Sequence, residues 1–185
     1  MSDAEPATFG AGDGPTVDAS NQSQVPDINV ERWAAVAVET LAAERVMVGH
    51  LDLTFIDPGE MADLNRAHMG HDGPTDVLSF PLDGGDDLAP NGHSKADDDA
   101  QIDTPPMLLG DIVICPQVAM TQAAEHCGDA DTELTLLVVH GVLHILGHDH
   151  AEPEEEAVMI EREAAHLQRY GLIHPGPVRP ESDRS

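Results

Sequence analysis

Apolar residues recur along the chain with two different periods, and together they predict a mixture of helices and strands. A spacing of three to four residues predicts helices over 30–45, 58–68, 117–127, 132–146 and 153–170. Alternation or short apolar runs predict strands over 15–22, 46–56, 75–82 and 107–114. This order favours an α+β fold, a single domain with a small mixed β-sheet packed with about five helices.

Polar residues mark where several of these helices begin. Asp27 or Asn29 can cap the first helix, and Asp57 with Glu60 three residues later forms a capping-box pattern for the second. Asp131 is expected to cap the helix over 132–146, which is apolar nearly all round and should cross the centre of the domain. The last helix is expected to bury the face formed by Ala157, Ile160, Ala164 and Leu167.

Composition limits the folded domain to residues 14–174. Residues 1–13 are rich in Gly, Ala, Pro and acid and are expected to be disordered, and residues 175–185 are expected to form a tail. The segment 83–106 contains seven Asp with several Gly and Pro, which predicts a mobile acidic loop. It lacks the ligand spacing and the closing Glu of an EF-hand, so calcium binding is not expected there.

The charge of the chain opposes easy binding to nucleic acid. There are 35 acidic against 8 basic residues, a formal net charge of −27, which repels polyanions at long range. The two cysteines, Cys115 and Cys127, lie in apolar segments without a CxxC partner, as is typical of reduced thiols in a cytosolic protein. The start has no signal-peptide pattern, and no apolar run reaches ~18 residues. We therefore expect a cytoplasmic protein without membrane contact.

Three histidines in the stretch HGVLHILGHDH, residues 140–150, carry the candidate chemistry. His140 and His144 lie one helical turn apart, about 40° apart around the helix axis, so both rings can reach one point. Gly147 allows the chain to turn, and His150 can return as a third donor. Three imidazoles in an aliphatic region would cost several kcal/mol without partners. The spacing predicts one zinc ion per chain, with an open fourth position.

The neighbours of these histidines help to choose a reaction. His148 points elsewhere by its register, and Asp149 either accepts from a ligand N–H or caps the turn. Gly141 occupies the position at which metzincin peptidases carry their glutamate general base. Because peptide hydrolysis needs such a base and phosphodiester cleavage relies more on charge neutralisation, the pattern disfavours a peptidase.

The same stretch resembles the H-G-x-L-H-L-x-G-Y/H-D-H signature of the YbeY family of bacterial endoribonucleases. GPTDVLSFP at 73–81 and LGDIVI at 109–114 resemble two further family segments, in the same order. The resemblance covers about residues 15–174 and implies a zinc-dependent, single-strand-specific endoribonuclease. Such an enzyme acts in 3′-end maturation of small-subunit (16S) rRNA and in ribosome quality control. The resemblance also implies that a metal-activated water attacks the phosphodiester. It assigns the three zinc ligands of the family to His140, His144 and His150.

The resemblance also implies binding partners, and the chain departs from the family pattern at one position. Single-stranded RNA and the small ribosomal subunit are the expected partners, with a ribosomal or assembly protein to assist docking. Met69 stands where the family usually has an Arg, and Arg66 is the nearby substitute, as an RNA contact or as a surface residue. His68 and His71, with the metal, would keep the cleft neutral or mildly positive. Thr75, Asp76 and Ser79 are expected to be structural, in a turn or a strand-start cap.

Two other functions remain open from the sequence. One is a non-catalytic ribosome assembly factor in which zinc only stabilises the fold, favoured by Met69 and by the acidity. The other is a metzincin-like metallopeptidase, which would need an acid in place of the missing glutamate. No catalytic side chain beyond the three metal ligands is assigned.

Overall fold

A computed structural model describes residues 6–10, 12, 14–82, 107–126, 129–148 and 152–175. The strands are β1 (Ala7–Phe9), β2 (Thr16–Asn21), β3 (His50–Phe55), β4 (Val77–Pro81) and β5 (Leu108–Ile114). The helices are α1 (Val30–Ala43), α2 (Pro58–His68), α3 (Pro116–His126), α4 (Ala130–Ile145) and α5 (Pro153–Arg169). The predicted α+β fold with a small mixed sheet is confirmed.

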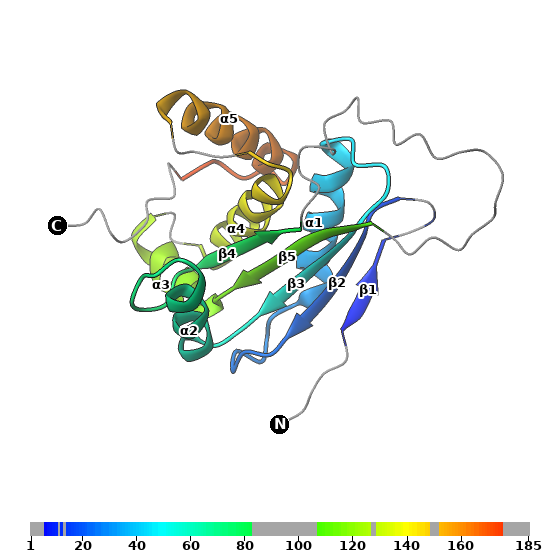
Figure 1. Ribbon diagram of the computed structural model, residues 1–185. Helices are drawn as coiled ribbons and strands as arrows, with labels where there is room; N and C mark the ends of the chain where they lie inside the picture. The colour runs from blue at the N-terminus through cyan, green and yellow to red at the C-terminus, as the bar shows by residue number, and fades with distance from the viewer. Residues whose placement is uncertain are drawn as a thin grey trace.

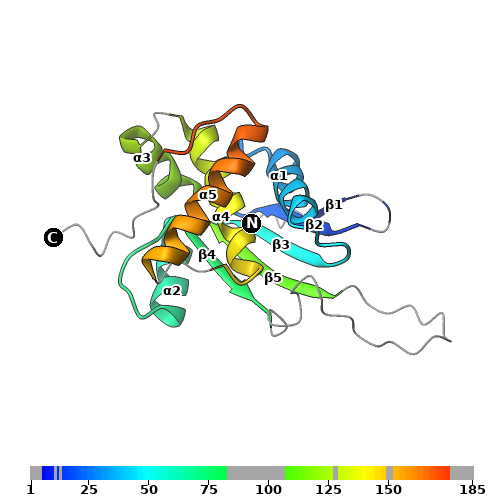
Figure 2. The same ribbon diagram turned by 90° about the horizontal axis from the view of Figure 1, so that it is seen from above.

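The strands form one mixed sheet in the order β1-β2-β3-β5-β4. Strands β2, β3 and β5 run parallel, whereas β1 and β4 pair antiparallel with β2 and β5 at the two edges. Helices α1 and α4 lie side by side on one face of this sheet, and α5 packs on α4 (Figures 1 and 2). Helix α4 therefore lies between the sheet and α5, and nearly all of its residues are buried, as predicted.

Strand β3 illustrates how the sheet separates its two faces. Leu51, Leu53 and Phe55 are fully buried against the helices, while His50 and Asp52 point to the opposite face. A second, smaller apolar cluster joins α2 to the ends of the strands and is formed by Ile56, Met61, Leu78 and Cys115. None of the described helices is long and apolar enough to cross a membrane.

Two helix caps differ from the prediction. Asp57 precedes α2, but its side chain makes no cap hydrogen bond. Instead its carboxylate accepts from the backbone and side chain of Gln24, at 2.9 and 2.8 Å, and from Gln117 at 2.7 Å. The cap of α4 is Asp129, which accepts from Thr132, whereas the expected Asp131 pairs with Arg32. Both carboxylates are recruited by partners distant in sequence, which the local pattern does not contain.

Two further elements correct the sequence prediction. Ala7–Phe9 lies inside the segment expected to be disordered, yet it pairs with the free edge of β2 as a short strand. Leu167 of α5 is buried as predicted, but the rest of the buried face is shifted by one residue, to Met159, Glu163 and His166, and Ala157 is exposed. The shift is possible because both polar residues on this face have hydrogen-bond partners. The predicted loop 83–106 and most of the two tails lie outside the described residues.

Candidate metal centre

His140 and His144 face one another from successive turns of α4. Their Nε2 atoms lie 3.0 Å apart, and the rings meet at 80° with centroids 4.5 Å apart. Zinc–nitrogen bonds of about 2.0–2.1 Å in a tetrahedral site place two ligating nitrogens roughly 3.3 Å apart. The pair therefore fits two positions of one zinc ion. His150, the predicted third ligand, and Asp149 lie outside the described residues.

The other nitrogen of His140 contacts a buried carboxylate from α5. Nδ1 of His140 lies 2.6 Å from Oε1 of Glu163, and Nε2 of His174 lies 2.7 Å from Oε2. Burial alone would raise the pKa of Glu163, but hydrogen bonds and charge from both histidines lower it to about 2. Glu163 is therefore ionised at neutral pH. Sequence analysis missed both Glu163 and His174, because neither belongs to the histidine stretch.

Gly141 lies against the sheet, on a different side of α4 from the histidine pair. A Cβ atom placed on Gly141 would lie 2.9 Å from Cγ2 of Ile112 in β5, closer than such atoms approach. Ser79 of β4 also donates to the carbonyl oxygen of Gly141, at 3.4 Å. A glutamate general base thus has no room at this position, in agreement with the sequence argument against a metzincin peptidase.

A second, partly buried network ties α5 to the end of α1. The carboxylate of Glu44 accepts from Arg162 and lies 2.8 Å from Nε2 of His166. His148, just after α4, is half-buried, and its pKa is lowered by burial and then by Arg162, with Glu44 opposing. Among the described residues, Arg162 is thus a cation close to the end of the histidine helix, and it is already neutralised by Glu44.

The segment around Met69 is solvent-facing. Arg66 has a 59% exposed side chain and pairs with Asp63 and Asp72, both at 3.2 Å. Met69 follows the end of α2 and is exposed. Of the two roles left open for Arg66, these ion pairs favour the surface role, and an RNA contact stays a prediction. His68 packs edge-on against Phe80, with ring centroids 4.9 Å apart.

Asp76 has the structural role that the sequence predicts. Its carboxylate accepts from the backbone N–H of Val77 at 2.8 Å and from the hydroxyl of Thr75 at 2.9 Å. Its carbonyl oxygen accepts from the backbone N–H of Cys115, at 2.7 Å. These contacts fix the start of β4 beside the end of β5. Thr75 and Asp76 therefore shape the strand start.

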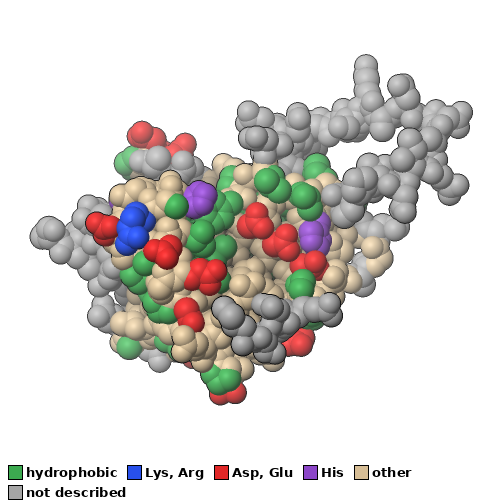
Figure 3. Space-filling view, turned by 60° about the horizontal axis from the view of Figure 1, so that its bottom comes forward, with side chains coloured by type: hydrophobic (Ala, Val, Ile, Leu, Met, Phe, Trp, Pro, Cys, Tyr) green, Lys and Arg blue, Asp and Glu red, His purple; other side chains and the backbone are tan. Residues whose placement is uncertain are grey.

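A different group that could hold a metal ion lies on the sheet face opposite the main helices. Asp18, His50 and Asp52 each offer a ligand atom within 4.8 Å of the others. Asp52 stands directly between Asp18 and Asp111 in the strand register. The pKa of Asp52 is raised by burial, and Asp111 and Asp18 raise it further against the opposing effect of His50. Figure 3 shows acidic side chains beside a histidine on the lower side of the molecule, and few basic ones.

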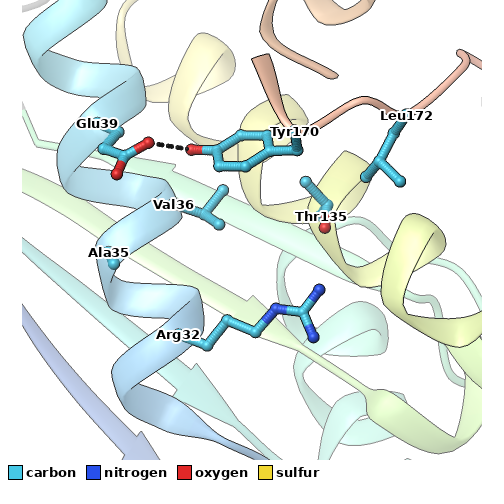
Figure 4. A pocket seen from close by; sticks show the side chains of 7 residues that line it. All are labelled: Arg32, Ala35, Val36, Glu39, Thr135, Tyr170 and Leu172. Carbon is cyan, nitrogen blue, oxygen red and sulfur yellow. Dashed lines mark hydrogen bonds between the residues drawn. The ribbon is translucent and has the colours of Figure 1, made fainter. Parts of the chain in front are cut away.

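The residues that line the pocket drawn in Figure 4 include none of the histidines described above. It has a volume of about 210 Å³ and is lined by α1, by Thr135 of α4 and by the segment after α5. Tyr170 donates to Glu39 across it, at 2.8 Å. Burial and then Glu39 raise the pKa of this phenol, so the ring stays neutral. We assign this pocket no chemistry.

Comparison with known proteins gives a consistent answer. The family profile described as Endoribonuclease YbeY matches residues 16–171. An Endoribonuclease YbeY from Frankia casuarinae is 44% identical over 141 residues, 76% of this chain and 67% of the relative. One from Salinispora tropica is 43% identical over 151 residues, 80% of this chain and 92% of the relative.

A solved structure shares the fold. The solution structure of TM1509 from Thermotoga maritima aligns with a TM-score of 0.52 and 24% identity, covering 81% of this chain and 85% of that one. It supports the α+β architecture alone. The profile and the curated relatives, which span most of the described domain, carry the assignment: the chain belongs to the YbeY endoribonuclease family.

Proposed function

We propose that this chain is a zinc-dependent, single-strand-specific endoribonuclease acting in 3′-end maturation of small-subunit (16S) rRNA and in ribosome quality control. Membership of the family makes it a hydrolase of the nuclease class. The observation that carries the proposal is the 3.0 Å approach of Nε2 of His140 to Nε2 of His144. We assign one zinc ion per chain to His140, His144 and His150.

The chain's own residues contribute more by positioning the metal than by transferring protons. When bound, zinc supplies Lewis acidity, which lowers the pKa of water and offsets negative charge on phosphate. His140 and His144 are fixed by their place on the buried helix α4. Gly141 can neither take nor give a proton, so its position offers no general base. This favours phosphodiester over peptide cleavage, because the former depends more on charge neutralisation.

The described residues offer few cations to an RNA backbone. Three of the five arginines in the described residues, Arg32, Arg66 and Arg162, are each engaged by acidic side chains, which leaves Arg45 and Arg169. The formal net charge of −27 opposes approach of a polyanion. We therefore propose that a ribosomal or assembly protein, together with the small subunit, brings the RNA to the site.

The test is cleavage of end-labelled single-stranded RNA and of a duplex of the same sequence. We expect cleavage of the single strand only, its loss on chelation, and its return with zinc. His144→Ala should abolish cleavage, whereas His50→Ala, in the acidic group on the other sheet face, should not. Loss of metal and cleavage in His50→Ala but not in His144→Ala would move the site to the Asp18–His50–Asp52 group.

The same samples distinguish the competing functions. A non-catalytic assembly factor with structural zinc predicts no RNA cleavage at any zinc level, together with a melting temperature that falls on chelation. A peptidase predicts hydrolysis of casein that is lost in His144→Ala. Either result would contradict the proposed nuclease.

A further inference from the structure

A buried hydrogen-bonded chain links α4, α5 and the segment that follows α5. It runs from Nδ1 of His140 to Oε1 of Glu163 at 2.6 Å, and from Oε2 of Glu163 to Nε2 of His174 at 2.7 Å. The carboxylate is 2% exposed, and both ring side chains are 8% exposed. A carboxylate this deeply buried is costly unless both of its oxygens are engaged, and here both are.

This arrangement fixes the state of the His140 ring. An ionised carboxylate only accepts hydrogen bonds, so Nδ1 of His140 must carry the proton that points to Glu163. In the neutral ring, the acceptor lone pair is then on Nε2, the atom that faces Nε2 of His144. Rotation of the ring would break the 2.6 Å contact. The contact therefore selects both the tautomer and the orientation that a metal ligand needs.

We infer that Glu163 is a positioning residue for the metal centre, which holds His140 in its ligating form, and that His174 holds Glu163 in turn. The inference rests on the proposed assignment of zinc to His140 and His144. It gives the segment after α5 a role in metal affinity, although this segment is distant in sequence from the histidine stretch. Glu163 would also be a carboxylate that accepts a hydrogen bond from a metal ligand, a role that then does not depend on Asp149.

A control for this contact is Glu44, at the end of α1, which contacts a different histidine of α5. Glu44 also contacts a buried histidine, with its Oε1 atom 2.8 Å from Nε2 of His166, and this contact likewise ties α5 to another helix. It involves neither His140 nor His144. Glu44→Gln therefore removes a largely buried carboxylate that contacts a histidine of α5, here also paired with Arg162, without touching the metal ligands. A general loss of stability would appear in both variants, whereas loss of ligand positioning would appear only in the variant at Glu163.

The experiment measures the zinc dissociation constant of the full chain by competition with a chromophoric chelator. The proteins are the wild type, Glu163→Gln, Glu163→Ala, His174→Ala and Glu44→Gln, with the melting temperature of each metal-free protein recorded alongside. We expect Glu163→Ala to weaken zinc binding by about 10–100-fold. Glu163→Gln should weaken it less, because its amide oxygen can still accept from Nδ1. Glu44→Gln should leave the constant unchanged.

The outcomes separate this inference from the proposed function. A wild type that binds no zinc overturns both. A wild type that binds zinc, with Glu163→Gln and Glu163→Ala no weaker than Glu44→Gln, overturns the positioning role alone. Where Glu163→Ala does not fold, the comparison of Glu163→Gln with Glu44→Gln decides. Unchanged affinity in His174→Ala overturns the part assigned to His174.

Discussion

Gly141 of α4 approaches Ile112 of β5 so closely that a methyl group on Gly141 would lie 2.9 Å from Cγ2 of Ile112. This contact sets the distance between the histidine helix and the sheet. Gly141→Ala should therefore destabilise the fold by about 1–3 kcal/mol through overpacking, although alanine is the better helix former. The measurement is chemical denaturation of the metal-free protein.

Ile112, the partner of Gly141 in this contact, provides a control. In an Ile112→Ala background, the cavity accommodates the added methyl group, and Gly141→Ala should cost much less. The coupling free energy from the double-mutant cycle should then be opposite in sign to the destabilisation caused by either single substitution. An equal cost in both backgrounds would show that Gly141 is not packed against Ile112.

Asp52 is expected to destabilise the fold when ionised. Its pKa is raised, mainly by burial, so the folded state gains stability as the pH falls through the folded-state pKa of Asp52. Asp52→Asn should therefore be more stable than the wild type at pH 7, because it removes the burial of a charge and its repulsion by Asp111 and Asp18, against the attraction of His50. The gain should be at most about 0.5 kcal/mol, because the side chain is 47% exposed. The gain should shrink as the pH falls.

The measurement compares unfolding free energies in chelator between pH 7 and 3. Asp131→Asn, which removes an exposed ion pair with Arg32, should show no gain. Destabilisation of Asp52→Asn that appears only when divalent cations are added would mean that the Asp18–His50–Asp52 group binds a cation.

Glu163 should give the opposite dependence on pH. Its pKa is lowered to about 2 from a usual value of 4.5, so its contribution to stability is complete above pH 4.5 and is lost as the pH falls towards 2. In chelator, Glu163→Gln should be less stable than the wild type at pH 6. The difference should narrow steadily below pH 4.5. A difference that stays constant down to pH 3 would show that Glu163 is not held ionised in the fold.

The binding of RNA should depend weakly on salt. Each phosphate neutralised by a protein cation adds about −0.7 to the slope of log affinity against log salt for single strands. Because Arg32, Arg66 and Arg162 are already paired, Arg45 and Arg169 are the described cations left for phosphates, and two such contacts give a slope no steeper than about −1.4. Fluorescence anisotropy with a labelled single strand at 50–200 mM KCl measures it. A slope steeper than about −4 would point to a basic surface in the remaining residues.

Local sequence patterns were sufficient for the parts of the fold that depend on neighbours along the chain. The spacing of His140 and His144 placed both rings on one side of a helix, and the structure brings their Nε2 atoms together. The alternation in β3 likewise separated Leu51 and Leu53 from Asp52. Such patterns are set by backbone geometry alone, which the sequence expresses directly.

The features that sequence reasoning missed all depend on tertiary contacts. Glu163 is 23 residues from His140, and no periodicity links a glutamate on one helix to a histidine on another. The spacing of apolar residues also does not predict that Glu163 and His166 are on the buried face of α5. Their burial depends on hydrogen-bond partners in other parts of the chain. Asp57 fails as a cap for the same reason, because Gln24 and Gln117 engage its carboxylate.

The most direct test of the metal centre is the zinc content of freshly purified His144→Ala set beside that of the wild type and of His50→Ala. We predict one zinc per chain in the wild type and in His50→Ala, and a strong loss in His144→Ala, with all three proteins folded by circular dichroism. One zinc per chain retained in His144→Ala, or none in the wild type, would contradict a zinc centre built on His140 and His144.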